Sequence, residues 1–371
     1  MIPVNEPLLN GNEKKYLNEC IDTGWISSEG PFINQFERNM CDYIGRKFAV
    51  AVTNGTAALE MALVALNIQI GDEVILPSFT IISCAQAIVK AGGIPILVDS
   101  EFDSFNVCVE HIEAKITSKT KAIMVVHVYG LPVDMDPVLK LAKKYNLKII
   151  EDAAEMHGQT YYNKKCGSFG DISIFSFYPN KHITTGEGGM ILTDDECIYN
   201  RCKSLRNLGF SPEANKRFIH DELGWNLRMT NLQAALGVAQ LERIEEFVQK
   251  KRWIGNLYQD LLQDIEVINL PLKGKAFAEN IYWVFAITLK DNFKKNTKQV
   301  MKELGEKGVG TRPFFYPMHQ QPVFNKMGLF EAESYPNAMK LYEQGFYIPS
   351  GLALTKEQIF EVSKILHEVL S

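Results

Sequence analysis

The stretch that decides the fold runs from Asp171 to Gly189 and reads DISIFSFYPNKHITTGEGG. Its first half, residues 171–177, is rich in apolar and β-branched side chains, which is typical of a buried strand. Its second half places Lys181 and His182 side by side, just before a glycine-rich turn. A strand that ends in a loop with polar residues is the usual pattern of a ligand site in an α/β sheet.

Six more runs of this kind lie between residues 48 and 195, and helical segments alternate with them. This alternation predicts an α/β fold with a mainly parallel sheet covered by helices on both faces. Strands this uniformly apolar are buried on both sides, so we expect a ligand at their carboxyl ends. The runs are FAVAVT (48–53), EVILPSF (73–79), IPILVD (94–99), AIMVVHV (122–128), LKIIEDAA (147–154) and GMILTD (189–194).

A chain of 371 residues exceeds what one hydrophobic core usually organises. We predict a large domain over residues 1–245, which includes the N-terminal segment, and a smaller C-terminal α+β domain over residues 246–371. The helical pattern of residues 229–263 is long enough to leave one domain and enter the other. The small domain has strand patterns in residues 281–289 and 310–316, and a final helix opened by the capping box Thr355–Gln358.

Composition argues against several classes of partner. The formal net charge is −5, and no basic run interleaves with aromatic residues, so we expect no nucleic acid. We find neither a signal-peptide pattern nor an apolar run long enough for a membrane span, and expect no membrane. Seven scattered cysteines without a CxxC pair favour the reducing cytoplasm. The seven histidines lack the spacing of metal ligands, so we expect no metal.

Two sequence features at strand ends suggest a site. After residues 48–53, Gly55 permits a tight turn into a helix whose first backbone N–H groups suit a phosphate, although turns of this kind are common without a ligand. After the apolar strand at 147–150, the carboxylates of Asp152 and Glu155 would be costly to bury without a partner. This pattern indicates a ligand or a local network, or else a plain helix N-cap.

Lys181 is the third feature. A lysine held among apolar and aromatic residues can have a lowered pKa and become nucleophilic enough to form a Schiff base, whereas a lone lysine is more often solvated at the surface. A phosphate cradle, a strand-end aspartate and a loop lysine with Ser176 just upstream are together the parts that a pyridoxal phosphate site requires. The sequence therefore predicts this cofactor, in its aldehyde or amine form.

Over essentially the whole chain, the sequence resembles the DegT-type nucleotide-sugar aminotransferases. The resemblance implies the aspartate-aminotransferase fold (fold type I), with a seven-stranded mixed sheet in the large domain. The motifs that carry it are IDTGWISSEGPFINQFE (21–37), NGTAAL (54–59), GDEVILPSFT (71–80), VDMDP (133–137), EDAAE (151–155), GSFGDISIFSFYPNKHITTGEGGM (167–190), LGWNLRMTNLQAALGVAQLER (223–243) and TRPFFYPMHQQP (311–322).

The resemblance also implies roles for individual residues. Lys181 matches the Schiff-base lysine, Asp152 the partner of the pyridinium nitrogen, Glu155 a neighbour of the ring hydroxyl and Ala154 a residue under the ring. Asn226 is expected to reach the cofactor phosphate of a neighbouring subunit, which implies a homodimer with shared active sites. The phosphate cup is matched by Gly55, Thr56, Ala57 and Ser176.

Within the family, three blocks are most similar to the perosamine-forming branch, which aminates the 4-keto group of GDP-4-keto-6-deoxy-mannose with L-glutamate for O-antigen synthesis. An aromatic residue often covers the cofactor ring in this family; here either Ile81 covers it or Phe79 approaches it instead. Two alternatives stay open: the same chemistry on a UDP- or dTDP-linked keto sugar, and a non-catalytic regulatory protein. The residues that we expect near the substrates are Trp25, Phe79, Glu187, Arg312, Tyr316 and His319.

The pair Lys181 and His182 decides the reaction class. A related branch of dehydratases carries a histidine in place of the Schiff-base lysine. Counted forward from Ser176 or back from Gly186, the family spacing falls on Lys181. We therefore predict amine transfer, with Lys181 also moving the proton between substrate and cofactor, and His182 as a structural neighbour.

Overall fold

The core of the molecule is a seven-stranded sheet in the order β1-β9-β8-β5-β4-β2-β3. The computed structural model describes residues 1–211, 214–216, 218–220 and 222–371. All seven apolar runs form strands, which confirms the predicted sheet. Their bounds are β1 (Phe48–Val52), β2 (Glu73–Pro77), β3 (Ile94–Val98), β4 (Thr120–Val126), β5 (Lys148–Asp152), β8 (Ile172–Ser176) and β9 (Gly189–Thr193).

The strand directions bring the predicted site residues to one edge. Strand β9 is antiparallel to both of its neighbours, β1 and β8, while the other pairs are parallel. Strands β1 and β8 therefore run in the same direction, and their carboxyl ends lie at the same edge as those of β5, β4 and β2. Asp152 ends β5 beside Ile174 of β8, and Ser176 ends β8 opposite Gly189. Residues that are far apart in the sequence thus converge at this edge.

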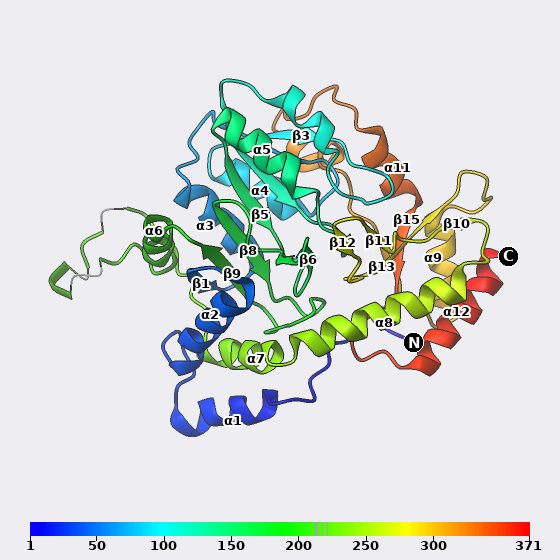
Figure 1. Ribbon diagram of the computed structural model, residues 1–371, viewed down its shortest axis with the longest axis horizontal. Coiled ribbons are helices and arrows are strands. Elements are labelled where there is room, and N and C mark those ends of the chain that lie inside the picture. Colours follow the sequence, from blue (N-terminus) through cyan, green and yellow to red (C-terminus); the bar gives the residue numbers. More distant parts are fainter. Residues whose placement is uncertain (212–213, 217, 221) are drawn as a thin grey trace.

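Helices cover both faces of this sheet (Figure 1). Alternate residues of β1 show the two faces, since Val50 and Val52 pack in one apolar cluster with α3, while Ala49 and Ala51 pack in another with α2 and α7. The helices of this part are α1 (Glu13–Thr23), α2 (Pro31–Ile44), α3 (Gly55–Ala65), α4 (Ile82–Lys90), α5 (Met135–Tyr145), α6 (Glu196–Arg206) and α7 (Asn231–Leu241), with the short turns η1 (Val109–His111), η2 (Glu113–Lys115) and η3 (Ala214–Lys216) and the hairpin β6 (Thr160–Tyr161) and β7 (Lys164–Lys165).

The long helical stretch of residues 229–263 is two helices. Helix α7 begins at a Thr230–Gln233 capping box, and α8 (Ile244–Leu262) follows after a break at Glu242 and Arg243. No glycine or proline causes this break. Instead Glu242 accepts hydrogen bonds from Asn12 Nδ2 (2.7 Å) and Tyr16 Oη (2.6 Å), which are contacts with the start of the chain that a helical pattern does not reveal.

The C-terminal part is built on an antiparallel four-stranded sheet, β10-β13-β15-β14. Helix α12 opens with the predicted capping box of Thr355 and Gln358 and packs against α8 and α9. The elements are β10 (Ile268–Asn269), β11 (Gly274–Lys275), β12 (Ala278–Glu279), β13 (Phe285–Leu289), α9 (Thr297–Glu306), β14 (Arg312–Pro313), η4 (Met318–Gln320), α10 (Pro322–Asn325), α11 (Pro336–Gln344), β15 (Gly345–Ile348) and α12 (Lys356–Leu370).

The first residues of the chain run along this small sheet. Ile2 bridges to Val309, and the Ser350 N–H donates to the Val4 carbonyl (3.0 Å). The division between residues 245 and 246 stays a prediction, and it falls in the first turn of α8. Among the described residues, no helix is both long and apolar enough to cross a membrane.

Candidate active site

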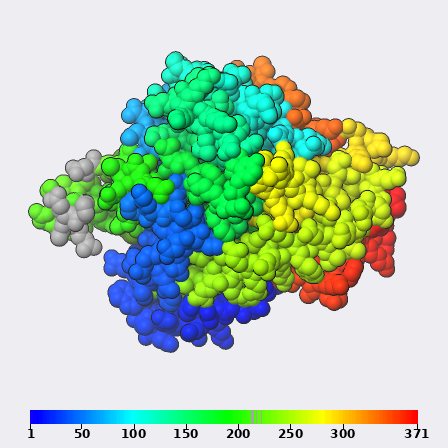
Figure 2. Space-filling view, viewed as in Figure 1, coloured from blue at the N-terminus to red at the C-terminus, as the bar shows by residue number. Residues whose placement is uncertain are grey.

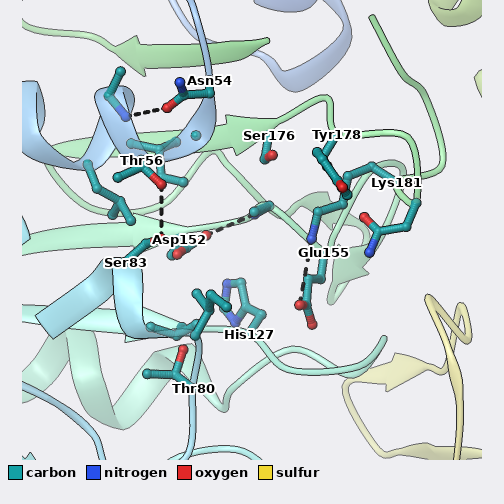
Figure 3. A pocket seen from close by; sticks show the side chains of 18 of the residues that line it. Asn54, Thr56, Thr80, Ser83, His127, Asp152, Glu155, Ser176, Tyr178 and Lys181 are labelled. Carbon is teal, nitrogen blue, oxygen red and sulfur yellow. Dashed lines mark hydrogen bonds and ion pairs between the residues drawn. The ribbon is translucent and has the colours of Figure 1, made fainter. Parts of the chain in front are cut away.

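A cavity of about 680 Å³ opens at the carboxyl edge of the large sheet (Figure 3). Its lining comes from the ends of β4, β5 and β8, from the first turn of α3, and from β15 and the segment before β13 of the C-terminal part. It includes ten residues that the sequence singled out: Gly55, Thr56, Ala57, Ile81, Asp152, Ala154, Glu155, Ser176, Lys181 and Glu187.

The first turn of α3 forms one end of the cavity. Asn54 caps this helix, because its side chain accepts a hydrogen bond from Ala57 N–H (2.8 Å) and its carbonyl accepts from Ala58 N–H (3.1 Å). The N–H groups of Gly55 and Thr56 have no partner within a helix at this position. A Cβ on Gly55 would lie 2.8 Å from Ser176 Cβ, so only glycine allows this close approach. The result is a helix N-terminus with free donors next to a serine hydroxyl, which suits an anion.

Asp152 lies fully buried at the end of β5. Its Oδ1 accepts from Ala154 N–H (3.0 Å), and its Oδ2 accepts from the Cys84 thiol (3.4 Å). Burial raises the pKa of Asp152, and the Ala154 N–H and the nearby Lys181 act against this rise. A buried carboxylate with only these partners can hold a further cationic or N–H group.

Lys181 and Glu155 form a buried pair in the centre of the cavity. Lys181 Nζ is 3.7 Å from Glu155 Oε1, and Glu155 Oε2 accepts from Tyr129 N–H (2.8 Å). Burial lowers the pKa of Lys181 and raises that of Glu155, since both charged forms lose water. The amine is therefore nearer to its neutral, nucleophilic form than a surface lysine would be.

His182 lies in the interior of the molecule. Its ring is buried near His157 and Lys251, and burial holds its pKa well below the usual value. It does not line the cavity, whereas Lys181 does. The two neighbours in the sequence thus have separate environments, as expected for one reactive and one structural residue.

Ile81 and Phe79 were alternatives for covering the cofactor ring. Ile81 lines the cavity and is 43% exposed, while Phe79 is fully buried against Tyr129, Phe314 and Phe315. Of the two, only Ile81 is in a position to contact a ligand there. The expectation that Phe79 contacts a ligand is therefore corrected: its ring belongs to the core behind the cavity wall.

The cavity does not include five other predicted residues. Trp25 follows α1, and Asn226 bridges to Asn207 beside the segment after α6. Arg312 is exposed on β14, Tyr316 packs edge-on against Tyr342, and His319 Nδ1 lies 2.9 Å from Ser78 Oγ. Their roles toward the substrate or, for Asn226, toward the cofactor of a second copy stay predictions.

Several lining residues were not predicted from the sequence. Thr80, Ser83 and His127 follow β2 and β4, so the carboxyl-end rule could have found them. Ser83 Oγ lies 2.9 Å from Thr56 Oγ1. Tyr178 and Asn180 follow β8 in the stretch that holds Lys181, so the same rule could have found them. Trp283, Phe315 and Tyr347 have no such signal, because packing of the C-terminal part brings them in.

His127 also belongs to a buried group with Glu151 and Cys166, whose ligand atoms lie within 4.8 Å of one another. Both carboxylate oxygens of Glu151 already have partners within the protein. Its Oε1 accepts from Gly167 N–H (2.5 Å) and lies 3.1 Å from His127 Nε2, and its Oε2 accepts from Phe169 N–H (2.8 Å). Burial raises the pKa of the Cys166 thiol well above its usual value, which disfavours the thiolate that metals bind. This group is best described as a hydrogen-bonded support for His127.

The comparisons with known proteins agree with this geometry. The chain is 41% identical over 370 residues to the GDP-perosamine synthase of Escherichia coli O157:H7, covering 100% of this chain and 99% of that protein. It is 42% identical over 377 residues to the GDP-perosamine synthase of Caulobacter vibrioides, covering 100% and 98%. A solved aminotransferase from Psychrobacter cryohalolentis superposes with a TM-score of 0.92 at 30% identity over 98% of each chain.

These likenesses confirm the predicted aminotransferase fold and activity. The model of the DegT/DnrJ/EryC1/StrS aminotransferase family matches residues 7–367, which is nearly the full length. The chain belongs to the DegT/DnrJ/EryC1/StrS aminotransferase family.

Proposed function

We propose that the chain uses pyridoxal phosphate to transfer the amino group of L-glutamate to the 4-keto carbon of GDP-4-keto-6-deoxy-D-mannose, giving GDP-perosamine for O-antigen synthesis. The observation that carries the proposal is the convergence of Lys181, Asp152 and the start of α3 on one cavity. The choice of sugar is supported by the 41–42% identity to two GDP-perosamine synthases over the full chain.

The donor set of the cavity fits this cofactor. The free N–H groups of Gly55 and Thr56, with Ala57 and Ser176 beside them, suit its phosphate. Buried Asp152 suits a protonated ring nitrogen, because its partners among the described residues are one backbone N–H and one thiol, with no cationic group in contact. When bound, pyridoxal phosphate supplies the electron sink for amine transfer.

The chain's own groups then divide the remaining work. Lys181 provides the amine that attaches the cofactor and, when free, carries the proton to and from substrate. The Glu155 carboxylate partly balances the positive charge of that amine, since its Oε1 lies 3.7 Å from Nζ. The Tyr129 N–H donates to the other carboxylate oxygen and fixes its position. Ile81 and Ala154 provide apolar contact surface in the same cavity.

A panel of nucleotide-linked 4-keto-6-deoxy sugars tests the substrate. The protein is incubated with pyridoxal phosphate and L-glutamate, 2-oxoglutarate is measured, and the sugar product is identified. We expect turnover of the GDP sugar in preference to the UDP and dTDP sugars. Preference for a UDP or dTDP sugar, or amination at C3, would contradict the substrate while 2-oxoglutarate formation would still support the aminotransferase.

We further propose a homodimer in which each copy completes the other's site. The described residues that follow α6 extend away from the body of the molecule (Figures 1 and 2), and three of them are large, apolar and exposed: Phe218, Ile219 and Leu223. Exposed apolar side chains that form one contiguous patch can mark an interaction surface. Asn226 lies next to this segment and outside its own chain's cavity, which suits contact with a second copy.

Mixing two inactive variants tests shared sites. Lys181→Ala and Asn226→Ala are each purified, then unfolded and refolded together. If Asn226 serves the neighbouring site, mixed dimers have one intact site and regain about half of their activity per mixed dimer. No regain above the separate variants would show that Asn226 acts in its own chain, and a monomer in solution would contradict the dimer itself.

We also place the reaction in the cytoplasm. All seven cysteines are free thiols, and Cys41, Cys108 and Cys197 are at least partly accessible. Free accessible thiols of this kind persist in a reducing compartment.

A further inference from the structure

The amine of Lys181 has a second contact besides Glu155. Its Nζ lies 3.9 Å from the centroid of the Trp283 indole. Trp283 is buried, lines the cavity, and comes from the segment before β13. The amine is thus held between a carboxylate on one side and an aromatic face on another.

Trp283 is fixed at both its side chain and its backbone. Its Nε1–H donates to the Asn180 carbonyl (2.9 Å), which lies next to Lys181 in the chain. Its own carbonyl accepts from Lys251 Nζ (2.8 Å), a lysine that is 3% exposed and also donates to the Ser350 carbonyl (2.5 Å). Burial of a lysine that is bonded only to carbonyls is costly. We therefore assign Lys251 the role of fixing the Trp283 backbone through its carbonyl.

The reaction requires a group that stabilises the free amine of Lys181. Once Lys181 is no longer bonded to the cofactor, its amine must stay in the cavity and carry a proton there. An aromatic face stabilises an ammonium but cannot take its proton, whereas a second carboxylate could do so. The Glu155 carboxylate contacts the ammonium on one side only, so the rest of this buried ammonium has lost its water without a replacement.

We propose that Trp283 is a further residue of the amine-transfer reaction, because its indole face holds the free, charged Lys181 amine in a cation–π contact. Lys251 is the positioning residue of Trp283. This inference rests on the proposed function, in which Lys181 is the reacting amine. It names Trp283 by its contact with the reacting nitrogen and Lys251 by its contact with Trp283.

The pKa of Lys181 also depends on several other ionisable groups, whose charges must be the same in every variant compared. The acids that face it are Asp152, Glu155 and the Cys84 thiol. Three basic groups also belong to this environment: His157 and His182, whose pKa values Lys181 lowers, and Lys251, which lowers that of His182. Tyr347 and Tyr129 are the phenols that adjoin Glu155.

The test is competitive acetylation of the cofactor-free protein. Trace acetic anhydride labels neutral amines, and the Lys181 peptide is quantified by mass spectrometry as a function of pH. Exposed Lys302 serves as the internal reference. The variants are Trp283→Leu, which removes the aromatic face, and Trp283→Phe, which keeps a smaller one. Phe314→Leu is the matched control, because Phe314 is equally buried but does not line the cavity.

We expect Trp283→Leu to move the labelling midpoint of Lys181 down by about 0.5 to 1 pH unit, since the ammonium loses its cation–π contact. Trp283→Phe should shift it less, and Phe314→Leu should lower stability without shifting it. An unchanged or raised midpoint in both Trp283 variants would overturn the proposal, and Trp283→Phe still decides if the leucine variant does not fold.

The test separates this inference from the proposed function. The midpoint is measured without cofactor, so it reports the Trp283 contact whatever reaction the chain performs. Failure of the proposed function would show instead as absence of cofactor fixation on Lys181 or of 2-oxoglutarate formation. Lys251→Arg, which keeps the positive charge but alters the contact with the Trp283 carbonyl, should reproduce part of the Trp283→Leu shift, and no shift at all would remove Lys251 from the proposal.

Discussion

The predicted residues that line the cavity and those that lie outside it differ in how the fold positions them. The inner group, Asp152, Ser176 and Lys181, sits at or just after the ends of adjacent strands and faces one enclosed space. The outer group, Trp25, Arg312, Tyr316 and His319, comes from scattered segments and does not line that space. Among the described residues, the first group shares one cavity, while the second group does not line it.

The difference separates cofactor chemistry from substrate choice. The sheet fixes the inner residues through backbone pairing, as in the register that sets Asp152 beside Ile174. The outer residues depend on loops and on the C-terminal part, which can vary without disturbing the sheet. We therefore expect inner substitutions to stop both halves of the reaction and outer ones to affect only the sugar half.

The largest effect is expected for Lys181→Ala. Loss of the covalent and proton-transfer group should lower kcat by about 10⁴-fold or more in both half-reactions. Stopped-flow absorbance with glutamate alone and then with sugar measures each half. Retention of more than a few per cent of either rate would remove Lys181 from its role.

A smaller effect is expected for Asp152→Asn. Without its carboxylate the ring nitrogen is no longer held protonated, so the glutamate half-reaction should slow by about 10²–10³-fold. The paired outer variant, His319→Asn, should leave that half within about threefold and act on the sugar half. If both variants slowed the glutamate half equally, the contrast between inner and outer groups would be wrong.

Lys251→Met is expected to change the pH dependence of stability, in addition to its effect on Trp283. Burial lowers the pKa of Lys251 to about 7, against an ordinary value of 10.5. Between these two values the unfolded chain binds more protons than the folded one, so Lys251 makes the free energy of unfolding rise with pH. The variant should lose this rise, which is up to about 1.4 kcal/mol per pH unit. Urea unfolding at pH 7 and at pH 9 measures it, and equal slopes for both proteins would contradict the assignment.

The smallest effect on activity is expected for His182→Ala. Its ring does not line the cavity, so kcat should stay within about threefold of the wild type. The emptied space should cost about 2 kcal/mol of stability. Denaturant melts together with the glutamate half-reaction check both. A loss of kcat as large as that of Lys181→Ala would show that the histidine shares the chemistry.

Sequence patterns anticipated the sheet and the inner group because both follow from local signals. Apolar runs gave the seven strands, and glycine, aspartate and lysine at their ends gave Gly55, Asp152 and Lys181. Trp283 escaped, since it sits in an apolar run whose pattern is that of any buried strand. The break between α7 and α8 escaped for a similar reason: Glu242 meets Asn12 and Tyr16 only in the folded chain.

The central claim is that Lys181 is the amine that binds the cofactor. The full chain is incubated with pyridoxal phosphate, reduced with borohydride and digested, and the modified peptide is sequenced by mass spectrometry. We expect one reduced pyridoxyl group per chain, on Lys181 in the segment FYPNKHITTGEGG. Fixation on a different lysine, or bound cofactor that reduction leaves unattached, would contradict it.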